Sequence, residues 1–197
     1  MFTKLAPFLT IFVETDSGQT DGPASKLLRG DAWQAKLTIE RVQGDCQVLT
    51  LTVTPQGTLR LKRLGLLFSS KLLPTGTRLI GFGGLQDINA DAPLAAKPQI
   101  GGFAIGLLLP MGDNWLLGID TFYDLPSIFS LVNGQLSAGW LGQTVISQTT
   151  SWSWRLSRGK NLERLFDDYA DSLTKSYPPT RRPRLDVLTG WNSWDYY

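Results

Sequence analysis

The strongest constraint in this sequence is an alternation of apolar and polar side chains with a period of two, which runs from residue 33 to residue 157. This period is typical of antiparallel β-strands that bury one face, because successive side chains of a strand point to opposite sides. Residues 33–43, 46–54 and 58–68 show it most clearly. Gly44-Asp45 is expected to close a hairpin between the first two of these runs.

Two local features refine the prediction of strands. In the run from residue 58 the alternation slips by one residue at Lys62-Arg63, which predicts a β-bulge. Asn133-Gly134 stands between the apolar runs 128–132 and 135–140. Asn-Gly in this setting indicates a two-residue hairpin turn, because both central residues of a type I′ turn need a positive φ.

Further strands complete a large β domain. Residues 105–109 and 115–122 are expected to pair, and residues 145–156 are expected to form the last strand, with Trp152 and Trp154 on one face. So many strands, joined by short turns with no helix between them, favour a mainly β fold. We expect a large antiparallel β-sandwich of the supersandwich type.

The period changes near Gly159. Apolar residues recur at helical spacing from residue 160 to residue 176 and charged residues occupy the other face, which predicts one amphipathic helix. Pro178-Pro179 ends this helix, and residues 180–184 are typical of an extended linker. Residues 185–190 then have the pattern of a short buried strand, which has no partner of its own in the sequence and suggests the start of a second, parallel α/β domain.

Composition excludes several classes of function. Nineteen basic and seventeen acidic residues leave a net charge of +2, so we expect neither nucleic acid nor a membrane as a partner. The chain has no histidine and one cysteine, Cys46, which excludes a Ser-His-Asp triad and an intrachain disulfide. Cys46 is expected to be an inert structural thiol in a strand. No metal and no cofactor are expected.

The first residues have the pattern of a strand. An apolar run in residues 1–13 is followed by Glu14, Thr15 and Asp16, where a signal peptide would have small residues at a cleavage site. No stretch approaches the roughly 18 uninterrupted apolar residues of a membrane span. We therefore expect a first β-strand here, in a soluble, cytoplasmic protein.

The strongest functional pattern is at residues 190–197, where four of eight residues are aromatic. Two tryptophans and two tyrosines supply broad apolar faces, and Asn192 and Asp195 supply hydrogen-bonding groups beside them. Such a mixture suits a ligand that has both CH-rich faces and hydroxyl groups, as a sugar has. From the residues alone, the alternative that these aromatic side chains fill a core remains open.

The segment Gly190-Trp191-Asn192-Ser193-Trp194-Asp195 closely resembles the motif at the end of the first barrel strand in α-galactosidases of glycoside hydrolase clan D, especially the melibiase type of family 36. Members of that family have a β-sandwich, a linking helix and a (β/α)8 barrel in this order. The resemblance implies a sandwich domain over residues 1–158, a linker over 159–184 and the first strand of a truncated barrel over 185–197.

The resemblance implies a retaining hydrolase that removes terminal α-linked galactose from oligosaccharides of the melibiose and raffinose type. Such an enzyme uses two carboxyl groups about 5 to 5.5 Å apart, one as nucleophile and one as acid and base. In this family both lie on later barrel strands, so no catalytic residue is expected in this chain, and the chain alone should be inactive. Its expected role is structural and oligomerising, with the missing barrel as a partner and a homo-oligomer as its assembly.

Five residues are candidates for substrate binding in the full protein. The family motif assigns the galactose pocket to Trp194, with Asp195 beside it and Trp191 nearby, although the position of Trp191 also fits a structural role. Phe82 and Gln86 lie in the Gly-rich stretch 81–87, which resembles a sandwich loop that leans over the barrel mouth in family members. The tryptophan expected in that loop is absent, and a plain β-turn is the alternative.

Other charged groups are expected to be solvated. Asp167 and Asp168 are adjacent on the predicted helix and point about 100° apart, so they cannot act together on one bond. Arg181, Arg182 and Arg184 form a basic cluster in the linker, where pairing with acidic groups of the barrel or simple solvation explains them.

Two alternative functions remain open. A stand-alone carbohydrate-binding β-sandwich would use Trp140, Trp152 or Trp154 as an aromatic face. A galactosyltransferase fragment similar to raffinose synthase would keep the family but change the reaction. The galactosidase hypothesis makes one structural prediction of its own: the helix at 160–176 and the terminal strand should present an uncovered apolar strip where the barrel docks.

Overall fold

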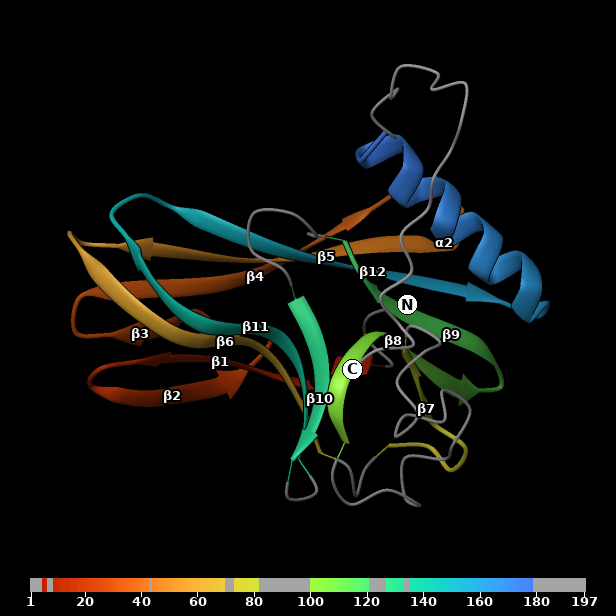
Figure 1. The fold of residues 1–197 in the computed structure, drawn as a ribbon, viewed down its shortest axis with the longest axis horizontal. Helices are drawn as coiled ribbons and strands as arrows, with labels where there is room; N and C mark the ends of the chain where they lie inside the picture. Colours follow the sequence, from red (N-terminus) through yellow and green to blue (C-terminus); the bar gives the residue numbers. More distant parts are fainter. Residues whose placement is uncertain are drawn as a thin grey trace, which may run out of the picture.

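The computed structural model describes residues 5–6, 9–42, 44–69, 73–81, 100–120, 127–132 and 135–178. Within these ranges the chain is mainly β, and a helix follows the last strand (Figure 1). The elements are β1 (Leu9–Thr15), β2 (Gly18–Pro23), β3 (Leu28–Gly30), β4 (Trp33–Arg41), β5 (Cys46–Pro55), β6 (Leu59–Ser69), β7 (Arg78–Gly81), β8 (Ile100–Met111), β9 (Asp113–Ile119), β10 (Ser127–Val132), β11 (Gln135–Ile146), β12 (Thr150–Gly159) and α2 (Leu162–Ser176).

The strands form one antiparallel sheet that folds over on itself. Its order is β2-β1-β6-β11-β10-β8-β9-β12-β5-β4-β3, and β7 adds to β8. Figure 1 shows β1, β2, β6 and β11 in one layer and β4, β5 and β12 in the other, with β8 and β10 where the sheet bends. This arrangement confirms the predicted antiparallel β-sandwich.

The core lies between the two layers. Alternation along β12 turns Trp152, Trp154 and Leu156 inward, where each is fully buried, and leaves Ser153 and Arg155 on the outer face. The rings of Trp140 and Trp152 meet across the sandwich with their centroids 6.3 Å apart. Residues of this size dominate the energetics of a core, so truncating one to alanine would cost about 3–5 kcal/mol.

Several local predictions are confirmed. β4 and β5 pair as a hairpin, and the amide of Val42 donates to the carbonyl of Cys46 across its turn at 3.0 Å. The bulge lies at Lys62, because Glu14 pairs with Arg63 while the next residue of β1 pairs with Leu61. β8 and β9 pair closely around Gly112, which has a φ of 88°.

The last strand predicted at residues 145–156 is confirmed from Thr150 onward as β12, but its predicted start is wrong. Its first two residues end β11 in one layer, and β12 begins in the other layer at Thr150. The chain turns between the layers at residues 147–149, a polar stretch with neither glycine nor proline to mark it. β2, β3 and β7 are strands for which the alternation gave no prediction, because each is short or consists largely of glycine and polar residues.

The predicted helix is confirmed as α2. Asn161 caps its N-terminus, with the side-chain oxygen accepting from the amide of Arg164 at 3.0 Å. Glu163 in the first turn and Lys175 in the last turn complement the helix dipole. The helix packs on β9 and β12, so it continues the sandwich directly. The division of the chain at residues 158 and 184 stays a prediction.

Candidate functional site

The residues predicted to bind substrate lie outside the described part of the chain. These are Trp191, Trp194 and Asp195 in the C-terminal motif and Phe82 and Gln86 in the glycine-rich stretch. The arginines of the predicted linker and the strand predicted at 185–190 also lie outside it. Their roles stay predictions that rest on the sequence.

The aromatic face expected of a stand-alone sugar-binding sandwich is wrong. Trp152 and Trp154 are completely buried, and Trp140 is 6% exposed. The indole N–H groups of Trp152 and Trp154 are buried and have no hydrogen-bond partner, as in an apolar core. No sugar can stack on rings that lie between the two layers, so these tryptophans are structural.

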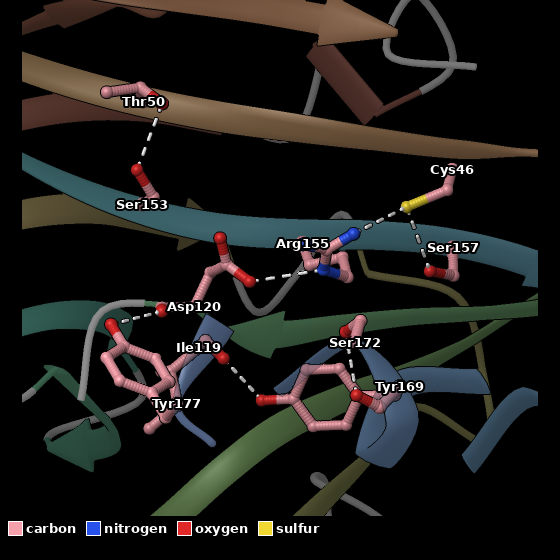
Figure 2. Close-up of polar contacts among 10 residues, drawn as sticks. All are labelled: Cys46, Thr50, Ile119, Asp120, Ser153, Arg155, Ser157, Tyr169, Ser172 and Tyr177. Carbon is pink, nitrogen blue, oxygen red and sulfur yellow. Dashed lines mark hydrogen bonds and ion pairs between the residues drawn. The ribbon is translucent and has the colours of Figure 1, made fainter. Parts of the chain in front are cut away.

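Several polar groups meet on the outer face of β9 and β12, under α2. We call this the helix-docking site (Figure 2). Strand alternation places it: the inward side chains of β9 and β12 fill the core, and the residues between them face the helix. The site consists of Leu116, Gly118, Ile119, Asp120, Arg155, Leu165, Tyr169 and Tyr177.

Tyr169 is the centre of the docking contact. Its ring lies over Gly118, where a Cβ atom would stand 2.4 Å from the ring carbon Cζ. Its hydroxyl donates to the main-chain carbonyl of Ile119, and both groups are buried. Leu165, one helical turn earlier, packs beside it against Leu116. The fit therefore requires glycine on the strand and tyrosine on the helix.

An ion pair borders the tyrosine. The carboxylate of Asp120 accepts from Nε of Arg155 at 3.1 Å, and these side chains are 15% and 14% exposed. The carbonyl of Asp120 accepts from the hydroxyl of Tyr177 at 2.9 Å, and its amide donates to the carbonyl of Ser153. Asp120 thus joins the end of β9 to β12 and to the end of the helix (Figure 2).

Burial and charge act in opposite directions at this ion pair. Burial lowers the pKa of Arg155, but the carboxylate of Asp120 and the hydrogen bond to Cys46 outweigh it, so the pKa ends above its usual value. Burial raises the pKa of Tyr169 well above its usual value, and the nearby negative charge of Asp120 raises it further. The phenol therefore keeps its proton and stays a donor to Ile119.

Cys46 lies beside this network, as a strand residue on the outer face. Its sulfur is 3.6 Å from Nη1 of Arg155 and 3.5 Å from the hydroxyl of Ser157, and the thiol is free and half-buried. The cysteine is in a strand as expected, but its neighbours are polar and it is not part of the apolar core. It is a member of the polar outer face of β5 and β12.

The uncovered apolar strip expected on the helix is wrong. Leu165 and Tyr169 are 4% and 6% exposed because they are covered by β9. Asp167 and Asp168 are exposed on the opposite face, as predicted, and Asp168 lies 3.9 Å from Arg164 across one turn. The docking contact itself was missed, since one glycine between apolar strand residues carries no pattern that identifies its partner.

Two further classes of site have no candidate among the described residues. No group of three or more cysteine, aspartate or glutamate side chains is arranged to hold a metal ion in that part of the chain. No helix within the same ranges has the length and apolar character needed to cross a membrane.

Comparisons with known proteins give weak similarities. No protein-family model and no curated protein matches the chain. Among solved structures, a polysaccharide lyase superposes with a TM-score of 0.48 at 13% identity over 84% of this chain and 27% of that one. A protein from the human microbiome, named as a putative kojibiose phosphorylase, superposes with a TM-score of 0.43 at 7% identity over 86% of this chain and 25% of that one. The chain spans about a quarter of the length of these proteins, and neither likeness carries an argument about activity.

Proposed function

We propose that this chain is the non-catalytic, N-terminal scaffold of an α-galactosidase-like retaining glycosidase. The observation that supports the proposal is the order of the elements: the sandwich and α2 come ahead of the segment that contains the motif 190–195. The order of sandwich, helix and motif is the order of the family that the motif resembles.

The physical role of such a scaffold is to position the catalytic domain that comes after it in the chain. Tyr177, at the end of α2, donates to the main-chain carbonyl at the end of β9, so the chain leaves the sandwich at a fixed point. A retaining glycosidase needs its carboxyl groups about 5 to 5.5 Å apart across the scissile bond, and a displacement of about 1 Å can cost 100-fold in rate. A rigid exit from the sandwich would limit such displacements.

Trp194 and Asp195 would contact galactose in the full protein, as their place in the motif implies. An indole ring offers its face to the CH groups of a sugar, and a carboxylate accepts hydrogen bonds from hydroxyl groups. Neither residue forms or breaks a bond in this proposal. The two catalytic carboxyl groups would come from barrel strands beyond residue 197.

The experiment compares the full open reading frame that contains this sequence with the chain 1–197. Both are purified and assayed with 4-nitrophenyl α-D-galactoside, with the β-anomer as control substrate. We expect the full protein to release nitrophenol from the α-anomer, to give α-galactose as the first product by NMR, and the chain 1–197 to be inactive. Transfer of galactose to added sucrose would indicate the transferase reaction instead.

A variant separates substrate contact from folding. Trp194→Ala in the full protein should raise KM for the galactoside at least about tenfold through loss of ring contact, while Trp140→Phe, in the core, should mainly lower stability. An open reading frame that ends at residue 197, or a full protein with no activity on α-galactosides, would contradict the proposal.

A further inference from the structure

A second polar site lies where the two terminal strands of the folded sheet meet. β2 and β3 are the terminal strands of the sheet order and lie next to each other. The turn after β1, the turn after β3 and the start of β6 surround a cleft of about 300 Å³ there. A volume of this size is at the lower end for small-molecule sites, which suits one sugar ring.

The floor of the cleft is apolar and its walls are polar. Trp33 and Leu59, which are 5% and 8% exposed, close its base. The indole of Trp33 lies directly over Gly30, where a Cβ atom would stand 2.4 Å from Nε1. Thr15 and Thr20 line the wall that belongs to the other layer. Trp33 belongs to the core and supports the base from below, and the polar groups of the wall can exchange hydrogen bonds with a sugar.

The rim carries charges of both signs. Asp16 is occupied, since Lys62 and Arg60 lie 3.2 Å and 3.8 Å from its carboxylate. Arg29 and Asp31 stand on either side of Gly30, and within the described chain their side chains make no ion pair or hydrogen bond. A free guanidinium and a free carboxylate at one rim can donate to one hydroxyl group and accept from another.

The charges of the lining also select against ions. Two aspartates and two arginines line the cleft, so their formal charges cancel. An anion or a cation would gain one favourable partner and meet one like charge at close range. A neutral ligand with several hydroxyl groups uses both charged groups without that penalty.

We propose that this cleft binds a neutral saccharide through the exposed side chains of Arg29 and Asp31. None of the lining residues belongs to the helix-docking site or to the motif 190–195, so this proposal does not depend on the proposed function. An open, solvated cleft of this size supports weak binding, with a Kd on the order of 1 mM for a single hexose.

The test is a titration of ¹⁵N-labelled chain 1–197 with D-glucose and, separately, D-galactose, followed by amide chemical shifts. We expect saturable shifts confined to residues 15–20, 29–33 and 59–60. Asp31→Asn and Arg29→Gln, both at exposed positions, should each weaken binding by about tenfold. Asp21→Asn and Lys26→Gln remove the same charges at exposed positions outside the cleft and should change the Kd by less than about twofold.

Two results would overturn the proposal. One is the absence of saturable shifts with either hexose at concentrations up to roughly 50 mM, or saturable shifts at other residues. The other is a response of the same amides to sodium phosphate or sodium acetate but not to hexose, which would assign the cleft to an ion. Because every variant lies at the surface, the amide spectrum of each also reports whether the fold is intact.

Discussion

The ring of Tyr169 stands where a side chain at residue 118 would have to be, with only 2.4 Å between Cζ of the tyrosine and a Cβ atom built on Gly118. The same tyrosine donates through its hydroxyl to the carbonyl of Ile119, the next residue of the strand. Shape and polarity therefore act together at one point of contact between α2 and β9. This pair makes the helix part of the sandwich.

Gly118→Ala is expected to destabilise the protein by about 1–3 kcal/mol, because the added methyl group overlaps the buried ring of Tyr169 and the helix must shift. Urea unfolding followed by circular dichroism measures the loss. In a Tyr169→Ala background the same substitution should cost much less, since the overlap is gone. Equal costs in the two backgrounds would show that the ring does not set the spacing between helix and strand.

Tyr169→Phe is expected to cost about 1–3 kcal/mol, because it leaves the buried carbonyl of Ile119 without a donor. Tyr177→Phe removes a hydroxyl of the same kind from a half-buried position, where water can replace it at the carbonyl of Asp120. Tyr177→Phe should therefore lower the free energy of unfolding by only about 0.5–1 kcal/mol. An equal or larger loss for Tyr177→Phe would contradict the assignment of Tyr169 as the main anchor.

Alkaline pH provides a separate test of the buried phenol. Burial raises the pKa of Tyr169 in the folded chain above its unfolded value of about 10. Below about pH 10 the tyrosine keeps its proton in both the folded and the unfolded chain, so its contribution to the free energy of unfolding is complete. Above that pH the unfolded chain releases the proton first. The free energy of unfolding should therefore fall by about 1.4 kcal/mol per pH unit. The comparison is with Tyr169→Phe at each pH, since the other tyrosines cancel, and parallel curves would refute the prediction.

The ion pair of Asp120 and Arg155 should matter more than the ion pair of Asp45 and Arg158. Asp120→Asn leaves a guanidinium that is 14% exposed without its counter-charge, at an expected cost of about 2–3 kcal/mol. Asp45→Asn breaks a pair at 2.7 Å whose side chains are 53% and 37% exposed, so solvent replaces the interaction and the change should be small. The midpoints of urea unfolding of the two variants show which ion pair contributes more to stability. A larger loss for Asp45→Asn would contradict the prediction.

Much of the sandwich could be predicted because burial of one face imposes a period of two on the sequence. The pairing of β4 with β5 followed from that period, and the bulge at Lys62 followed from its single interruption. The helix followed from apolar spacing between residues 160 and 176. Each of these predictions depends on interactions between residues that are close in sequence.

The errors come from features that have no local pattern. The turn at residues 147–149 contains neither glycine nor proline, so the last two residues of β11 were assigned to the strand that follows in the other layer. β2 and β3 are the terminal strands of the sheet order; β2 is exposed along most of its length and β3 has three residues, so neither shows clear alternation. The contact between β2 and β3 creates the cleft at Trp33. No pattern in the sequence shows that these two strands lie side by side.

The helix-docking site could not be predicted for a similar reason. Gly118 and Tyr169 are 51 positions apart, and their fit depends on the distance between a helix and a strand. Nothing in the sequence around Gly118 or Tyr169 indicates that the glycine leaves room for the tyrosine ring. Trp152 and Trp154 of β12 show the converse case, since alternation placed them on one face but could not decide whether that face was inward.

Native-state hydrogen exchange of the chain 1–197 tests the central claim, that α2 is a fixed part of the sandwich, most directly. The amides of Leu165, Tyr169 and Leu173 should open with the same free energy as those of Leu116 and Leu117 in β9, because helix and strand unfold as one unit. Opening of the helix at a free energy lower by about 2 kcal/mol or more, while β9 stays protected, would contradict the account.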